Sequence, residues 1–281
     1  MLKKLIFLTL FIAFQVHAEP LHIVAAENFY GDIASIIGGK NVQVVSILNN
    51  PQQDPHLFST SPATAKAIAN ANIIIYNGLD YDVWMEKLIT THSQKNIIVV
   101  ADLIHKKSGD NPHIWYDIKT MLVYAKYLTA QLCISDPAHQ LYFQQQLNQF
   151  QQYYQKLQQQ VDKDKIQFHN LPIIATEPLF NEMADSLGLQ MYGQAFQLSV
   201  MNNTEPSPLE IKDFENHLLN HTVKVLILNN QVSNPLTQRM EEIAISAHIP
   251  SIGISELQPI NEDYFTWMSA QLSALEKALG E

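Results

Sequence analysis

The chain has 281 residues, of which 47% are hydrophobic and 16% charged, and its formal net charge at pH 7 is -10. This length is enough for two domains of ordinary size. The acidic balance argues against nucleic acid or an anionic membrane surface as the main partner, because both require a basic patch. Cys133 is the only cysteine, which excludes an intramolecular disulfide bond, and its apolar helical surroundings predict a buried, inert thiol.

The first residues have the pattern of a targeting segment. Lys3-Lys4 is followed by an apolar run over residues 5–14 and by the small-residue pattern Val16-His17-Ala18, which together predict a signal peptide over residues 1–18. The apolar run is too short to cross a bilayer, and we expect no membrane insertion of the mature chain. No cysteine follows the cleavage signal, so we expect no lipid anchor. In a bacterium with two membranes, the product would be a free periplasmic protein.

The first half of the chain alternates strand and helix signals. Strands are predicted over residues 21–26, 42–48, 73–76 and 97–100, and helices over residues 29–37, 62–71 and 84–90. Gly38-Gly39 is a helix-ending signal, and Ser61-Pro62 supplies an N-cap followed by proline at the first helical position. Strands linked through helices predict a parallel sheet with helices on both faces. Ligands of such sheets bind beyond the carboxyl ends of the strands.

Two similar turns follow strands of this half. They are Asp54-Pro55-His56-Leu57-Phe58 and Asn111-Pro112-His113-Ile114-Trp115. Proline fixes its own φ and biases the preceding residue toward extended backbone, so each turn presents its histidine from a stiff, non-helical segment. We interpret the pair as two imidazoles directed at a common metal site. Two histidines in surface loops are the simpler alternative.

A glutamine-rich stretch without Gly or Pro extends from Asp136-Pro137 to about residue 164. Apolar residues recur there at roughly helical spacing: Leu141, Phe143, Leu147, Phe150, Tyr154, Leu157 and Val161. We predict one amphipathic helix of about 28 residues and about 42 Å, long enough to extend along two domains. A coiled-coil segment is the alternative, although the heptad is not sustained.

The second half repeats the α/β pattern. Strands are predicted within residues 171–176, 189–196, 223–228 and 251–254, and helices over residues 178–188, 208–219, 235–247 and 262–279. Glu177 and Glu256 each follow a strand, which places both carboxylates at the carboxyl edge of the second sheet. We therefore divide the chain into an N-terminal lobe (residues 19–135), a linker helix (136–165) and a C-terminal lobe (166–281).

With these motifs, the chain resembles the cluster A-I solute-binding proteins of bacterial ABC transporters, which deliver zinc, manganese or iron. The resemblance rests on the two Pro-His turns, the long helix, Thr176-Glu177-Pro178-Leu179-Phe180 and Glu205-Pro206-Ser207-Pro208, and it covers essentially the whole mature chain. It implies an α/β fold of two Rossmann-like lobes, each a mainly parallel sheet flanked by helices, joined by one long backbone helix. It also implies a monomer without enzymatic activity that captures a metal in the periplasm and delivers it to a permease in the inner membrane.

The resemblance implies four metal ligands. The first lobe supplies His56 and His113, and the second supplies Glu177 and Glu256. The fourth position is usually Asp in this family, so Glu256 departs from the common pattern. Two neutral imidazoles and two carboxylates suit Zn²⁺, Mn²⁺ or Fe²⁺. Tetrahedral ligation favours zinc, whereas a carboxylate that binds through both oxygens favours manganese.

The metal itself stays open between zinc and manganese. Zinc-delivering members often carry a His-rich insertion before the second histidine, and the corresponding segment 103–110 contains only His105. His105 is either a capture residue near the cleft or has no role. Glu205 is either solvated or helps the lobes meet.

Several single residues have structural alternatives. Glu177 precedes Pro178 at a helix start, where an acidic side chain also serves as a cap. Glu256 alone would be a surface acid. Trp115 and Phe58 are expected to pack the turns, and Asp54 and Asn111 to orient the histidines, as metal ligands generally require.

Two other classes of function are compatible with a metal site. A zinc hydrolase can use two histidines and a carboxylate as zinc ligands, but the chain contains neither a His-Glu-x-x-His run nor a Gly-x-Ser-x-Gly elbow. The other class is an adhesin that holds its metal as a structural element.

Overall fold

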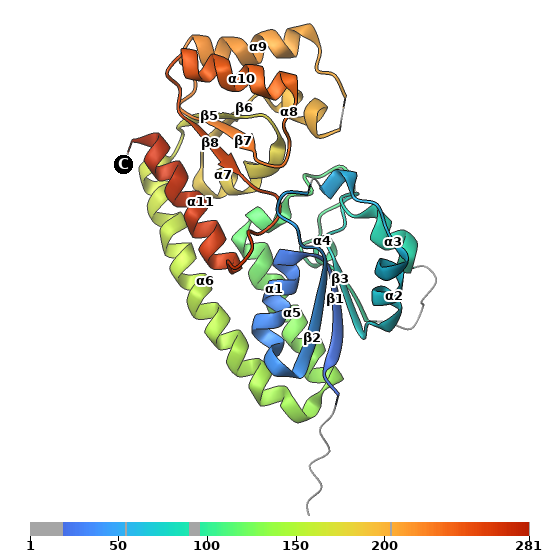
Figure 1. Cartoon of the computed structure of the whole chain (residues 1–281). Coiled ribbons are helices and arrows are strands. Elements are labelled where there is room, and N and C mark those ends of the chain that lie inside the picture. Colours follow the sequence, from blue (N-terminus) through green and yellow to red (C-terminus); the bar gives the residue numbers. More distant parts are fainter. Residues whose placement is uncertain (1–18, 54, 90–95, 203, 281) are drawn as a thin grey trace, which may run out of the picture.

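The computed structural model describes residues 19–53, 55–89, 96–202 and 204–280. The predicted signal peptide, Asp54 and the side chain of His56 lie outside this description. The described chain forms two four-stranded parallel sheets with helices around them, and one long helix extends along both (Figure 1). This arrangement confirms the predicted fold class. We call the sheet built from the first half, with its helices, the first lobe, and the other sheet with its helices the second lobe.

The sheet of the first lobe has the strand order β2-β1-β3-β4. Its strands are β1 (Leu21–Glu27), β2 (Val42–Leu48), β3 (Ile73–Tyr76) and β4 (Asn96–Val99). Helices cover both faces: Ile23 packs in the core on the side of α1 (Asn28–Gly38) and α5 (Ile118–Ser135), whereas Val24 packs with α2 (Pro62–Asn70) and α3 (Val83–Ile89). Because successive strand residues point to opposite faces, a strand covered on both sides must be apolar throughout. The short helix α4 (Val100–Leu103) continues directly from β4.

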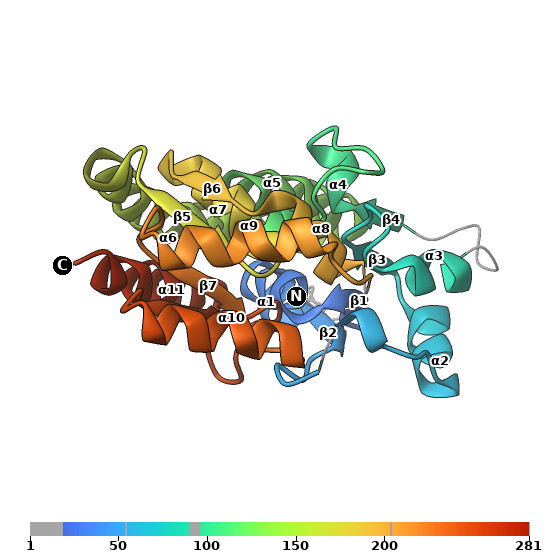
Figure 2. The same cartoon turned by 90° about the horizontal axis from the view of Figure 1, so that it is seen from above.

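The sheet of the second lobe has the equivalent order β6-β5-β7-β8. Its strands are β5 (Pro172–Ala175), β6 (Gln190–Tyr192), β7 (Leu226–Asn229) and β8 (Ser251–Ile254). Its helices are α7 (Asn181–Leu187), α8 (Gln194–Met201), α9 (Pro208–Leu219) and α10 (Pro235–Ser246). Seen from above, α9 and α10 lie side by side over this lobe (Figure 2). Ser207 and Asn234 start these two helices with capping boxes, each followed by proline at the first helical position.

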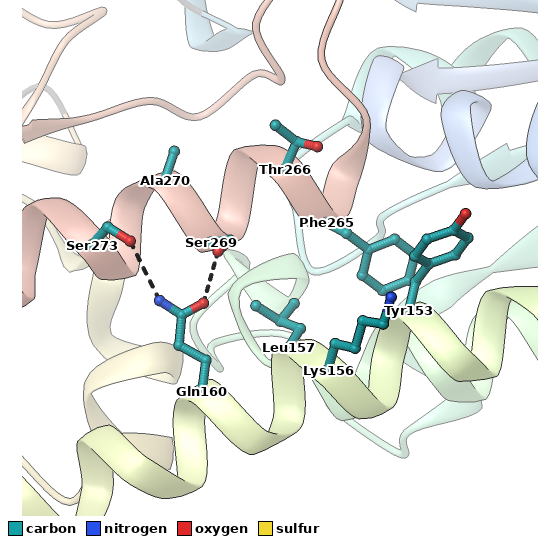
Figure 3. Close-up of a pocket in the computed structure, with 9 residues that line it drawn as sticks. All are labelled: Tyr153, Lys156, Leu157, Gln160, Phe265, Thr266, Ser269, Ala270 and Ser273. Atoms are coloured by element: carbon teal, nitrogen blue, oxygen red, sulfur yellow. Dashed lines mark hydrogen bonds between the residues drawn. The ribbon is translucent and has the colours of Figure 1, made fainter.

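Two helices connect the lobes. The predicted linker helix is α6 (Gln140–Phe168), preceded by a single 3₁₀ turn, and its 29 residues make it about 43 Å long. The last helix, α11 (Tyr264–Leu279), packs along α6 and contacts α1 in the first lobe. Between α6 and α11 lies a groove that Gln160 spans by hydrogen bonds to Ser269 and Ser273 (Figure 3).

An aromatic cluster fills the junction of α1, α11 and the segment after His113. Phe29 stacks on Trp115 with ring centroids 4.7 Å apart, and Trp267 stacks on Phe29 at 6.0 Å. Such pairs contribute about 0.5–1.5 kcal/mol each beyond the area they bury. The predicted packing role of Trp115 is confirmed, because its ring is fully buried there. Phe58 packs against Trp84 at 4.6 Å, as expected for the other turn.

One prediction from the sequence needs correction, and one helix was not predicted. Cys133 lies on α5 as expected for a helical residue, but it is partly exposed rather than buried. The strand predicted within residues 189–196 is confirmed as β6, and the helix α8, which the sequence did not predict, follows it after Gly193. The apolar residues of α8 do not continue the pattern of the strand, because Gly193 adopts a left-handed conformation and turns the chain between the two elements. No helix of the described residues is both long and apolar enough to cross a membrane.

Candidate metal centre

The predicted ligands lie at the carboxyl ends of the two sheets, which face one another across the centre of the molecule (Figure 1). The turn with His56 follows β2, and His113 follows β4 and α4. Glu177 follows β5, and Glu256 follows β8. Chain connections reverse direction at β1 in one sheet and at β5 in the other, and crevices of α/β proteins form at such switch points.

The structure brings the two glutamates together through a residue that the sequence analysis did not select. Glu177 is 3% exposed and Glu256 is 0% exposed. The side-chain amide of Asn229 donates to Oε2 of Glu177 at 2.7 Å and to Oε1 of Glu256 at 2.6 Å. Glu177 occupies the N-cap position of the following 3₁₀ turn, but its side chain makes no capping hydrogen bond. Its carboxylate is therefore directed into the centre and is not used as a helix cap.

His113 is held by Asn111, as the sequence analysis expected. Oδ1 of Asn111 lies 2.7 Å from Nδ1 of His113 and also accepts the backbone N–H of His113 at 3.1 Å. The orientation of the Asn111 amide follows from its nitrogen, because Nδ2 donates to the carbonyl of Pro178 at 2.8 Å. Oδ1 is thus the acceptor, so we assign the proton to Nδ1 and the lone pair to Nε2. A metal-binding imidazole held by an outer oxygen uses this tautomer.

Tyr81 connects His113 to the second lobe. Its hydroxyl donates to Oε2 of Glu256 at 2.9 Å, and its ring meets the His113 ring edge-on at 6.0 Å. Burial, followed by the charge of Glu256, raises the pKa of Tyr81 well above its ordinary value of 10.0. The hydroxyl therefore stays protonated at neutral pH and acts as a fixed donor to the carboxylate.

Further hydrogen bonds join the segments that carry the predicted ligands. Tyr116 of the first lobe donates to the carbonyl of Ser255 at 2.8 Å, next to Glu256. Gln231 accepts the backbone N–H of Glu256 at 2.9 Å and donates to the carbonyl of Pro51 at 2.6 Å, in the loop that leads to His56. The two lobes are thus in direct polar contact at two places near the predicted ligands.

A buried acid pair lies behind Tyr81. Burial, followed by the charge of Asp82, raises the pKa of Glu27 well above its ordinary value, and burial raises the pKa of Asp82 to about 7. Asp82 accepts the backbone N–H groups of Asn77 at 2.5 Å and Gly78 at 2.9 Å. Asp82 therefore fixes the turn that presents Tyr81.

The described side chains do not by themselves form a complete metal site. Among them, no three His, Cys, Asp or Glu residues gather closely enough to hold an ion. The side chain of His56 is not described, and its role as a ligand stays a prediction. His105 and Glu205 are both exposed, which agrees with the solvated alternative for Glu205.

Asn229, Tyr81 and Gln231 are the residues that reasoning from the sequence missed. Each lies at or just after the end of a strand or its following turn, at the same carboxyl edge as the glutamates. Strand-end position was the available signal.

Comparison with known proteins places the chain among metal-uptake components. The chain is 24% identical over 286 residues to the manganese ABC transporter substrate-binding lipoprotein PsaA of Streptococcus anginosus, covering 94% of this chain and 90% of that protein. The fold matches the periplasmic zinc-binding protein TroA of Treponema pallidum with a TM-score of 0.80 at 16% identity, covering 94% of this chain and 100% of TroA. It matches a crystal structure of ZnuA with a TM-score of 0.76 at 20% identity, covering 93% and 100%. Residues 23–278 match the family model of ZnuA, the periplasmic component A of a zinc-uptake complex, and the chain therefore belongs to this family.

Proposed function

We propose that this protein captures a divalent transition metal, Zn²⁺ or Mn²⁺, outside the cytoplasmic membrane and delivers it to the permease of an ABC transporter. The family match supports this function, as does the similarity to the manganese ABC transporter substrate-binding lipoprotein PsaA and to the periplasmic zinc-binding protein TroA. The cation binds between the lobes formed by residues 19–135 and 166–281, with 136–165 as their linker. The protein acts as a monomeric periplasmic carrier and performs no covalent chemistry.

The ligands in this proposal are His56, His113, Glu177 and Glu256. The observation that carries it is the convergence of two buried glutamates on one amide, opposite a histidine whose tautomer suits metal binding. Burying two neighbouring carboxylates is costly unless a cation or hydrogen bonds compensate them. A dication bound to both carboxylates and two neutral imidazoles neutralises the site.

The contacts between the lobes support a carrier that moves little. Tyr81 and Tyr116 bond across the junction, and α6 is a continuous helix rather than a flexible loop. Release then depends on weakening individual ligands. Protonation opposes metal binding, so the affinity should fall in acid as the histidines become charged.

The test is metal analysis and metal titration of protein purified without a metal-affinity tag. We expect one bound dication per chain in the wild type, and a large loss of affinity in His56→Ala, His113→Ala, Glu177→Gln and Glu256→Gln. His105→Ala and Glu205→Gln are the matched controls, because both side chains are exposed. Affinities unchanged in both histidine variants would overturn the ligand assignment.

The transport function is tested separately in cells. Deletion of the gene should impair growth in medium that contains a metal chelator. One metal should restore growth, and the concentration of that metal needed should be lower in the complemented strain than in the deletion strain. Metal-dependent turnover of esters or peptides by the purified wild type would contradict the carrier function and favour a hydrolase.

A further inference from the structure

One loop of the first lobe contacts the second lobe beside a proposed ligand. It covers residues 104–112, which follow α4. The ammonium group of Lys106 lies 2.9 Å from Oε1 of Glu182 on α7. Glu182 is five residues after Glu177 in the chain. The loop is therefore paired with the segment that begins at this glutamate.

A second side chain of the loop reaches the same segment. Nδ2 of Asn111 donates to the carbonyl of Pro178 at 2.8 Å, and Oδ1 of Asn111 accepts the backbone N–H of His113 at 3.1 Å. Asn111 thus joins His113 of the first lobe to the residue that follows Glu177. The loop consequently holds this segment of the second lobe at two points, one of them next to His113.

The loop is itself anchored on the first lobe. The backbone N–H of Lys106 donates to the carbonyl of Ala101 in α4 at 3.1 Å. Further along, Oγ of Ser108 donates to Oδ2 of Asp80 at 2.5 Å, in the turn that presents Tyr81. The Lys106 side chain therefore extends from a fixed backbone and holds α7 close to the first lobe.

The surroundings of the ion pair favour a positive charge on the loop. The side chains of Lys106 and Glu182 are 32% and 16% exposed, so solvent screens the pair only in part. Burial alone would lower the pKa of Lys106, but the hydrogen bond and the charge of Glu182 raise it overall, and the charges of Asp110 and Asp117 add to this effect. The ammonium group is therefore charged at neutral pH, and a negative side chain in its place would be repelled.

We propose that the loop 104–112 is a clasp between the lobes and that the Lys106–Glu182 ion pair slows the release of the bound metal. This inference rests on the proposed function. The pair exists only while α7 lies against the first lobe, so breaking it allows the segment after Glu177 to move away from His113. The cation then dissociates faster, because one of its proposed ligands is no longer held in place, and no large movement of the lobes is needed.

The experiment measures the rate at which Zn²⁺-loaded protein loses its metal to an excess of a chromophoric chelator after rapid mixing. Lys106→Met removes the charge, Lys106→Glu reverses it, and the double variant Lys106→Glu/Glu182→Lys exchanges the two charges. The matched control is Arg239→Met, because Arg239 forms an ion pair with Glu215 between α10 and α9, within the second lobe. The side chain of that glutamate is 18% exposed, close to the 16% of Glu182.

A partly exposed ion pair contributes up to about 1 kcal/mol, which corresponds to a factor of about five in a rate. We expect the release rate to rise about two- to fivefold in Lys106→Met, to rise further in Lys106→Glu, and to fall back toward the wild-type rate in the double variant. NaCl should accelerate release in the wild type and in Arg239→Met more than in Lys106→Met, because salt screens the pair. A merely structural effect of the substitutions would change neither the salt dependence nor the response to charge exchange.

Release rates of Lys106→Met and Lys106→Glu equal to that of the wild type would overturn the inference. So would a double variant that releases Zn²⁺ as fast as Lys106→Glu. Hydrogen exchange of the metal-free proteins, followed by mass spectrometry, is a test that needs no metal. Exchange over residues 104–112 and 178–187 should be faster in Lys106→Glu than in the wild type and unchanged in Arg239→Met, and equal exchange in all three would exclude the clasp.

Failure of the proposed function gives a different result. A wild type that binds neither Zn²⁺ nor Mn²⁺ would overturn the carrier function together with the effect on release, even where the exchange data show the clasp. Tight metal binding with a release rate independent of Lys106 would leave the carrier function intact and reject only the clasp.

Discussion

Replacing Tyr81 by Phe removes one hydroxyl and leaves the ring in place. That hydroxyl is the donor at 2.9 Å to Glu256 Oε2 and comes from the opposite lobe. The ring packs in the first-lobe core against Trp115, with centroids 5.1 Å apart, so the substitution should preserve the packing. The change therefore isolates a single hydrogen bond to a proposed ligand.

The magnitude follows from the charge of the acceptor. A hydrogen bond to a charged group contributes about 1.5–3 kcal/mol, which corresponds to roughly a 10- to 150-fold change in an equilibrium constant. Loss of an outer partner of a metal ligand typically costs about 10- to 100-fold in affinity. We therefore expect the Kd for the metal to rise about 10- to 100-fold in Tyr81→Phe, because Glu256 then keeps the hydrogen bond from Asn229 but loses the donor at Oε2.

The assay is competition titration of the purified proteins against a chromophoric chelator. Tyr124→Phe is the matched control: its hydroxyl is also buried and donates to the carbonyl of Tyr30 at 2.9 Å, but within the first lobe. It should lower the free energy of unfolding without changing the Kd. A Kd for Tyr81→Phe within twofold of the wild type would refute the positioning role of this hydroxyl.

Two further predictions concern stability. The pKa of Glu27 is raised well above its ordinary value of 4.5 by burial, so the unfolded chain loses this proton at lower pH than the folded chain, and the free energy of unfolding should fall as pH rises above about 4.5. The side chain introduced by Glu27→Gln is neutral at every pH, so the free energy of unfolding of this variant relative to the wild type should increase from about pH 4 to about pH 8 in urea unfolding. If the difference in free energy between the two proteins is independent of pH, the buried, protonated state of Glu27 is contradicted. Gly188 ends α7 at φ +67°, and an added Cβ would lie 2.5 Å from Nδ1 of His169. Left-handed strain alone costs about 1–2 kcal/mol, and Gly188→Ala should lower the free energy of unfolding by more than this amount. Gly109, at φ +93°, has open space where the Cβ would lie, so Gly109→Ala should show the strain only. Equal losses in the two variants would exclude the contact with His169.

The fold was predicted well because its signals are local. Continuous apolar runs such as 73–76 indicate strands covered on both faces, and they are β3 and its equivalents in the structure. Ser61-Pro62 starts a helix with the serine as N-cap and proline at the first helical position, as the sequence predicted. The helical spacing from residue 141 onward gave α6 nearly its full length. An error arose where the local signal was weak, at α8, which is separated from the three-residue strand β6 by Gly193 alone.

Of the candidate centre, the sequence predicts the histidines, the acids and Asn111. Pro-His turns and acids after strands are visible in the sequence, and so is Asn111, two residues before His113. Asn229 and Tyr81 are not distinguishable there from other polar residues near strand ends. Their roles depend on which strands are neighbours in the sheet and on which lobe faces which.

The sequence by itself determined the two-lobed α/β architecture, the long connecting helix and the edges at which polar residues gather, because periodicity, capping and proline turns act over a few residues. Only the tertiary structure decided which of those residues meet. Strand order places Asn229 between Glu177 and Glu256, and the contact of the lobes brings Tyr81 to Glu256. Such contacts join residues up to 175 positions apart in the chain, and no local pattern encodes a distance of that kind.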